Sequence, residues 1–333
     1  MKKIKIKSGV NLVVLPTTQF KTMHIAVDFA APLLDIDKVS ARSLLTYLTA
    51  VSSNKYPSQQ MVAQKAIDLY GAQYQTDVTR FGQTHHVRYT LQIPAPTYIG
   101  AENSLLHDAF DFLRDMIFDP LIMDDYFDLP IFTKEKQSLM NELDSLTDDK
   151  QRYAISKLRE LTYDLPAMTI SSSGRTSDVE ALTSKGVYQV YQDMINNDTI
   201  NIVVYGDIDE ARVVSELTTW PLLARQEQSL KPFYRQELFS VTNELTDVQA
   251  DINQAIMTIS YRLAIAPEDP RRFVALVMNA LFGGSPLSKL FTIIREKESL
   301  AYSIYSRWQH DTGFITVAVG LDADKVAQTD TMI

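Results

Sequence analysis

Cysteine is missing from all 333 residues of this sequence. Thiol nucleophiles, disulfide bonds and cysteine-bound zinc are therefore excluded, and a reducing cytosol is the expected setting. Long apolar runs are missing too. No stretch reaches the roughly 18 apolar residues that a membrane-spanning helix needs, and the start, MKKIKIKSGVNLVVLP, lacks the continuous apolar core of a signal peptide. We therefore expect a soluble, cytoplasmic protein.

Positive charge is scarce, because 32 lysines and arginines stand against 41 acidic residues and the net charge is −9. Phosphate backbones and anionic lipid surfaces are bound by concentrated Lys and Arg, so neither nucleic acid nor membrane is the expected partner. The Gly-x-Ser-x-Gly elbow of serine hydrolases is absent, and no Gly-Lys-Ser/Thr follows Gly283-Gly284 to make a phosphate loop. The 45% hydrophobic and 22% charged composition is that of a globular protein long enough for two domains.

The hydrophobic patterns indicate a mixture of strands and helices. Alternating runs predict strands, and apolar residues three and four apart predict helices. The predicted strands cover residues 2–7, 10–15, 22–30, 72–81, 85–93, 199–206, 255–263 and 314–321, and the predicted helices cover residues 38–51, 59–70, 102–117, 152–161, 179–195, 207–219 and 271–282.

The order of elements indicates an internal duplication. The strand 255–263, an acidic turn and the helix 271–282 repeat the order of the strand 22–30, the acidic loop 35–37 and the helix 38–51. We therefore predict an α+β fold of two homologous modules, each a mainly antiparallel sheet with helices packed on one face.

The predicted domain bounds follow from a stretch that shows neither the helical nor the strand periodicity of hydrophobic residues. Residues 223–249 are rich in Gln, Glu, Thr and Asp and are the expected linker. The first module is then predicted at 1–222 and the second at 250–333. The second is much shorter than the first, so we expect it to lack its closing part.

The stretch FGGSPLSKLFTIIREKESLAYSIYS, from Phe282 to Ser306, carries two polar landmarks, Arg295 and Tyr302. Ser285 before Pro286 predicts a helix start. The residues predicted for its buried face are Leu287, Leu290, Phe291 and Ile294. A folded-back turn after this helix would offer the guanidinium and the phenol to one oxygen atom. The alternative is that Arg295 compensates a helix C-terminus and Tyr302 fills a strand.

This stretch resembles the second half of the insulinase/pitrilysin zinc peptidases, the inverzincins, whose run reads Gly-Gly, a Ser- and Leu-rich helix, Arg-Glu-Lys and Leu-Ala-Tyr. The matching residues are Gly283, Gly284, Ser288, Leu290, Arg295, Glu296, Lys297, Leu300, Ala301 and Tyr302. The resemblance implies the fold of mitochondrial processing peptidase-like metallopeptidases. It also implies that Arg295 and Tyr302 hold and polarise the substrate peptide from the module that does not hold the metal.

The zinc motif of that family, His-x-x-Glu-His, is not present. Counting back from Tyr56-Pro57 by the family's spacing places its three positions at Ser43, Thr46 and Tyr47. Neutral hydroxyls do not compete with imidazole for zinc, and threonine cannot act as the general base. The resemblance therefore implies a degenerate zinc site that binds no metal.

The acidic helix of the family is better preserved. Glu135 and Glu142 in TKEKQSLMNEL lie seven residues apart, on one helical face. They resemble the family's paired glutamates, of which the second is the third zinc ligand, so Glu142 would be a remnant ligand position. The alternative is a solvated charged helix face.

No other set of residues offers a compact metal site. His85 and His86 are adjacent on a predicted strand and point to opposite faces, and the remaining histidines, His24, His107 and His310, are isolated in sequence. Surface or satisfied core positions are the expected roles of these side chains.

The resemblance covers nearly the whole chain and is greatest to members that lack the zinc motif and occur as partners of a zinc-bearing sister chain. It implies a non-catalytic subunit of a two-chain zinc peptidase, with zinc only on the partner and with a peptide as substrate. The alternative is an inactive peptide-binding or scaffold protein that acts as a homodimer. A third reading, an active zinc peptidase with unconventional ligands, lacks a ligand set in the sequence.

Overall fold

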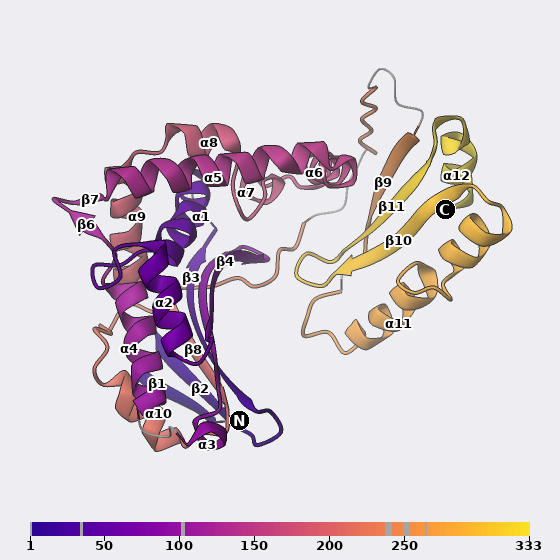
Figure 1. Cartoon of the computed structure of the whole chain (residues 1–333). Coiled ribbons are helices and arrows are strands. Elements are labelled where there is room, and N and C mark those ends of the chain that lie inside the picture. Colours follow the sequence, from indigo (N-terminus) through magenta and orange to yellow (C-terminus); the bar gives the residue numbers. More distant parts are fainter. Residues whose placement is uncertain (1, 34–35, 101–103, 237–241, 249–253, 264) are drawn as a thin grey trace. The chain divides into compact units, whose positions relative to one another are not determined.

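The computed structural model describes residues 2–33, 36–100, 104–236, 242–248, 254–263 and 265–333 (Figure 1). Its contacts divide the chain into two compact units. The first comprises residues 1–80, 84–141 and 172–230, and the second comprises residues 81–83, 142–171 and 231–333. The bounds 1–222, 223–249 and 250–333 stay a prediction.

The first unit is built on a six-stranded sheet in the order β1-β2-β8-β3-β5-β4. The β1–β2, β3–β5 and β3–β8 pairs are antiparallel, and the β2–β8 pair is parallel. The predicted hairpin at the start of the chain is confirmed. The strands are β1 (Lys2–Lys7), β2 (Val10–Pro16), β3 (Thr22–Pro32), β4 (Gln73–Phe81), β5 (Thr84–Pro94) and β8 (Thr199–Gly206).

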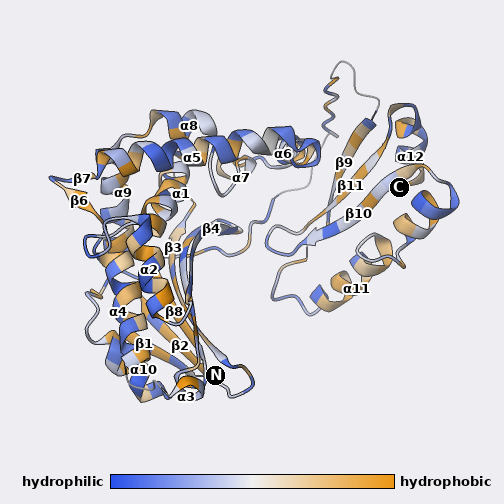
Figure 2. Cartoon of the chain, viewed as in Figure 1, coloured by the Kyte–Doolittle hydropathy of each residue, from blue (hydrophilic) through white to orange (hydrophobic). Residues whose placement is uncertain are grey.

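Helices cover one face of this sheet (Figure 1). Met23, Ile25, Val27 and Phe29 alternate along β3 and are fully buried, because period-two side chains share one face of a strand. Figure 2 shows the corresponding hydrophobic colouring along β2, β8 and α4. The helices of this unit are α1 (Ile36–Val51), α2 (Gln59–Asp68), α3 (Pro96–Ile99), α4 (Ser104–Phe118), α8 (Thr176–Ala181), α9 (Ser184–Asn197) and α10 (Glu210–Leu217).

Local signals explain several helix ends. Ser58 caps α2 by accepting a hydrogen bond from the Met61 amide, and Gly71 follows the helix with a positive φ of 77°. The single helix predicted at 179–195 is instead two, because Thr183 accepts from the Gly186 amide and starts α9 anew. A small hairpin of β6 (Ile122–Met123) and β7 (Tyr126–Phe127) precedes the long helix α5 (Leu129–Asp148).

The second unit has a three-stranded antiparallel sheet in the order β10-β11-β9. The central strand β11 is buried on both faces. Val317, Val319 and Leu321 pack with Leu290 and Ile294, and on the other face Phe314 meets the ring of Tyr163. The strands are β9 (Gln254–Arg262), β10 (Ala301–Gln309) and β11 (Phe314–Asp322). The helices are α6 (Lys150–Thr162), α7 (Pro166–Thr169), α11 (Arg272–Phe282), η1 (Leu290–Lys297), η2 (Ala323–Lys325) and α12 (Val326–Met332).

The two sheets repeat one another in strand order. In the first unit β3, β5 and β4 are neighbours, and in the second β9, β11 and β10 occupy the same sequence of positions. Helix α1 follows β3 and α11 follows β9. The predicted α+β architecture is confirmed, and this order supports the duplication.

The helix predicted from Ser285 differs in the structure. The Ser285 hydroxyl donates to the Ala280 carbonyl instead of capping a helix, and Leu287 is exposed. The regular segment η1 begins at Leu290 and is π-helical. The Ser288 hydroxyl accepts from the Phe291 amide, so the start lies one turn later than the Ser-Pro signal indicates.

Residues 221–236 and 242–248 contain no helix or strand, as the sequence predicted for this stretch. Part of it is nevertheless packed. Arg225, Tyr234 and Gln236 are buried, and Arg225 donates to the carbonyls of Ile195 and Asp198. Within the part of the chain that the structure describes, no helix is long and apolar enough to cross a bilayer.

Candidate functional site

The three expected metal positions lie on α1 and are packed. Ser43 and Thr46 are only 1% and 4% exposed, and Tyr47 is half-buried. The Thr46 hydroxyl donates to the Ser43 carbonyl over 2.7 Å, and the Thr46 carbonyl accepts from Thr76. The hydroxyl of Thr46 therefore satisfies the backbone of its own helix, which is the ordinary role of a buried threonine there.

A buried polar network anchors α1 beside these positions. Arg42 donates to Asp198 over 2.7 Å, to Nδ1 of His85 over 3.0 Å and to the Phe29 carbonyl over 3.0 Å. His85 Nε2 lies 2.8 Å from the Ser172 carbonyl. Because Nδ1 accepts from Arg42, the proton of the neutral ring belongs on Nε2, where it is donated to Ser172. The network ties α1 to β3, β5 and the start of β8.

This network predicts an acid-sensitive fold. Burial, and then the charge of Arg42, lower the pKa of His85 to about 3. The unfolded chain, with a histidine pKa near 6.5, binds the extra proton first as the pH falls. The stabilisation is therefore complete above about pH 6.5 and is lost toward pH 3, at about 1.4 kcal/mol per pH unit. Urea unfolding should show that the free energy of unfolding falls by about 2–3 kcal/mol from this cause between pH 7 and pH 4.5.

His85→Gln is the matched variant for this measurement, because glutamine keeps an acceptor for Arg42 and has no proton to gain. Its stability should fall less steeply than that of the wild type over the same pH range. The hydrogen bond to Glu216 raises the pKa of the exposed His107. The contribution of His107 to the free energy of unfolding is therefore lost as the pH rises, which is opposite to the behaviour of His85. Equal pH slopes for wild type and His85→Gln would contradict the assignment.

The two glutamates of α5 occupy different environments. Glu135 is 6% exposed and lies 3.2 Å from the ammonium of Lys134, whereas Glu142 is exposed. Among the residues that the structure describes, no group of three His, Cys, Asp or Glu side chains could hold a metal ion. A role of Glu142 as a remnant ligand position stays a prediction.

The adjacent histidines point to opposite faces of the sheet, as predicted. His85 contacts Arg42 on the helix side, while His86 Nδ1 lies 2.8 Å from Asp28 on β3. His24 stacks on Tyr205 with ring centroids 4.4 Å apart. Each of these contacts is a structural use of imidazole in a sheet or at its surface.

Arg295 and Tyr302 lie in the second unit, and both are exposed. Arg295 is on the last turn of η1 with its guanidinium 4.6 Å from the centroid of the Phe291 ring. Tyr302 follows at the start of β10 and is 57% exposed. The pairing of β10 with β11 shifts register between Ala301 and Ser303, so Tyr302 sits at a bulge. A bulge re-aims a side chain, which explains why this tyrosine points to solvent from a strand.

The Tyr302 hydroxyl donates to Asp322 at the end of β11, and Lys325 lies 3.1 Å from the same carboxylate. The hydrogen bond to Asp322 raises the pKa of Tyr302, so the phenol keeps its proton at neutral pH. Sequence reasoning missed Asp322 and Lys325. They are distant from Tyr302 in sequence, and only the pairing of β10 with β11 brings them together.

Arg295 and Tyr302 carry groups that can hydrogen-bond to a peptide, and the described residues contain no cluster of metal ligands. A protonated phenol donates one hydrogen bond and an exposed guanidinium offers several, which suits a carbonyl or carboxylate oxygen. Water activation by zinc in this family would need the two histidines of its motif, and α1 carries no histidine.

Known proteins resemble the chain over nearly its whole length. The family model described as "Peptidase M16 inactive domain" matches residues 181–333. A protein of Bacillus subtilis (strain 168), called "Probable inactive metalloprotease YmfF", is 28% identical over 98% of this chain and 76% of its own length.

Solved structures share the fold. A conserved protein from Enterococcus faecalis V583 superposes with a TM-score of 0.93 at 32% identity, over 99% of this chain and 77% of that one. The peptidase M16 inactive domain from Pseudomonas fluorescens superposes with a TM-score of 0.74 at 16% identity, over 99% of this chain and 76% of that one, and shows the fold alone. The chain thus belongs to the M16 peptidase family.

Proposed function

We propose that this chain is the non-catalytic subunit of a two-chain zinc peptidase. A zinc-bearing sister chain supplies the metal and its activated water, and this chain supplies Arg295 and Tyr302. Arg295 binds a carbonyl or carboxylate of the substrate peptide. Tyr302 exchanges its hydrogen bond to Asp322 for one donated to the oxygen on which negative charge develops. Hydroxyls at the expected metal positions, together with an exposed arginine and tyrosine, support this division of labour.

The presentation of Tyr302 is the observation that carries the proposal. A tyrosine that only filled the strand would direct its ring into the core formed with η1. Instead the bulge turns Tyr302 outward, while its neighbours Ala301 and Ile304 are buried. In this structure the phenol donates its only proton to Asp322, which holds the ring in a defined orientation, and a substrate oxygen would replace Asp322 as the acceptor.

A peptide also needs a surface that holds its backbone. Strand β4 is an outer strand of the six-stranded sheet and β10 is an outer strand of the three-stranded sheet. An extended peptide can add to such an edge through backbone hydrogen bonds. We expect an unfolded peptide to be held in this way while the partner's metal centre cleaves it.

The proposal predicts the metal content and the activity of the purified chain. The chain alone should contain no stoichiometric zinc by elemental analysis and should cleave no peptide from a mixed fluorogenic library. Adding a zinc-bearing M16 chain with an intact His-x-x-Glu-His motif should produce cleavage above that of the added chain alone. The added chain with its motif glutamate replaced by glutamine is the control, because it keeps the metal and loses the base.

Two outcomes would contradict the proposal. One tightly bound zinc per chain would mean that the metal positions were misassigned. An inert mixture with every zinc-bearing chain of the same organism would favour the alternative, a homodimeric scaffold that binds peptide without cleaving it. Sedimentation of the chain alone would then show a dimer.

A further inference from the structure

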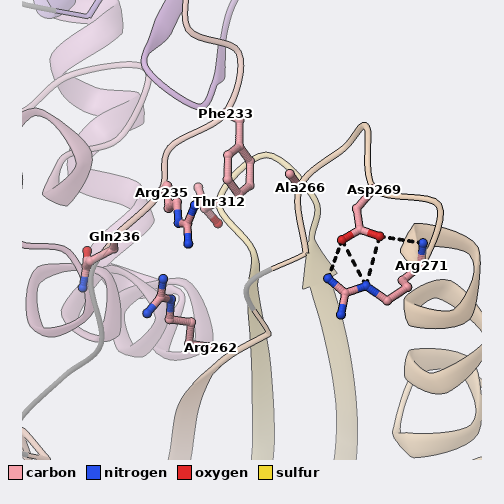
Figure 3. Close-up of a pocket in the computed structure, with 8 residues that line it drawn as sticks. All are labelled: Phe233, Arg235, Gln236, Arg262, Ala266, Asp269, Arg271 and Thr312. Atoms are coloured by element: carbon pink, nitrogen blue, oxygen red, sulfur yellow. Dashed lines mark hydrogen bonds and ion pairs between the residues drawn. The ribbon is translucent and has the colours of Figure 1, made fainter.

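A cavity of about 240 Å³ in the second unit is lined by three arginines (Figure 3). These are Arg235, which follows the irregular segment 231–234, Arg262 at the end of β9, and Arg271 just before α11. The remaining lining residues are Phe233, Gln236, Ala266, Asp269 and Thr312. Since a water takes about 30 Å³ of liquid, the cavity has room for roughly eight waters, or for one small anion with part of its shell.

The cavity carries excess positive charge in an acidic protein. Among the described residues that line the cavity, Asp269 is the one carboxylate, and it is engaged by Arg271 through contacts of 2.6 to 3.1 Å. These contacts lower the pKa of Asp269 to about 2, so it is ionised at neutral pH. Three arginines against one carboxylate leave a charge of about +2 on the lining that the structure describes, whereas the whole chain carries −9.

Two of the guanidinium groups have no protein partner within the part of the chain that the structure describes. Neither Arg235 nor Arg262 has a carboxylate or hydrogen-bond partner among those residues, and Figure 3 draws their guanidinium ends toward one another. Like charges directed into one cavity repel each other, and an anion between them removes that repulsion and uses their donors.

The backbone that carries these arginines is anchored. Tyr234 donates its amide to the Asp311 carbonyl over 2.9 Å. The Gln236 side chain donates to the Thr162 carbonyl and accepts from the Asp164 amide. Arg235 therefore stands between two fixed residues. Leu263, which follows Arg262, donates its amide to Gly313 over 2.7 Å. Donors held in place before binding lose less conformational entropy when a ligand arrives.

We propose that this cavity binds a phosphate-bearing small molecule. Guanidinium groups match phosphate oxygens in pairs, and a phosphate group offers more acceptor oxygens than a carboxylate does. Thr312 also lines the cavity, but its hydroxyl donates to Gln309 and accepts from Tyr163. The N-terminal end of α11 adds its partial positive charge beside Arg271. The site is separate from Arg295 and Tyr302 and does not depend on the proposed peptidase role.

The test is isothermal titration of the full chain with pyrophosphate in a phosphate-free buffer of low ionic strength. One saturable site per chain is expected, and its affinity should fall as salt is added. Arg235→Gln and Arg262→Gln should each weaken binding about tenfold or more, because each removes charge-assisted hydrogen bonds to the anion. Arg307→Gln is the matched control. It removes an exposed arginine of β10 that does not line the cavity, and its affinity should stay within about twofold of the wild type.

Unchanged melting temperatures without ligand will show that the variants are folded, which is expected because Arg235 is exposed and Arg262 is half-buried. If Arg307→Gln weakened the binding of pyrophosphate as much as the cavity variants do, pyrophosphate would be binding to general surface charge, and the proposal would fail. It would fail as well if citrate bound more tightly than pyrophosphate, since the site would then be one for carboxylates.

Discussion

Arg42→Ala is expected to lower the free energy of unfolding by roughly 3–5 kcal/mol, the cost of leaving a buried charge without its partner. The guanidinium and the Asp198 carboxylate are each less than a tenth exposed and lie 2.7 Å apart. Removing Arg42 also takes a donor from His85 and from the Phe29 carbonyl. Burial already raises the pKa of Asp198 despite Arg42, so the carboxylate left behind should take up a proton.

Urea unfolding at pH 7 measures this loss, and Lys38→Ala is its matched control. Lys38 lies on the same helix and pairs with Asp193 over 3.0 Å, but both side chains are nearly half exposed. An exposed pair contributes about 0–1 kcal/mol. If the two variants lost similar free energy, the network around Arg42 would be a surface feature, and the account of what anchors α1 would be wrong.

Tyr302→Phe is expected to lower kcat of the two-chain peptidase by about 10²–10³-fold, the loss typical of removing one donor to a developing oxyanion. The ring and its packing remain, and only the hydroxyl that donates to Asp322 is lost. Because the hydrogen bond to substrate strengthens mainly as charge develops, KM should change much less than kcat. Steady-state kinetics on a single fluorogenic peptide separate the two parameters.

Tyr305→Phe is the control, since it removes a phenol of the same strand whose hydroxyl accepts from Gln151. Its activity should stay near the wild-type value.

Arg295→Lys keeps the charge and loses the planar fork, so it should raise KM if Arg295 binds substrate. If the two-chain peptidase containing the Tyr302→Phe variant were as active as the wild type, Tyr302 would not stabilise the oxyanion. The alternative, an inactive scaffold protein, would then be favoured.

Local signals in the sequence predicted most of the elements. The alternation in KIKIKS and VNLVVLP is enough for a hairpin, and the Ser58 cap and Gly71 define the ends of α2, because caps and strand periods act between near neighbours. The start of η1 was misplaced, since Ser285-Pro286 is a valid helix signal that the competing hydrogen bond to Ala280 overrides.

The absence of cysteine and the hydroxyls at Ser43, Thr46 and Tyr47 already determined which chemistry this chain cannot perform at its expected metal positions, because ligand chemistry belongs to the residue types themselves. The order of strands and helices likewise determined the fold class. Only the tertiary structure decided that Tyr302 meets Asp322 at a bulge, that Arg42 is closed in by Asp198 and His85, and that Arg235 and Arg262 line one cavity. Those contacts join residues far apart in the chain, and their formation depends on strand register and packing that no local pattern encodes.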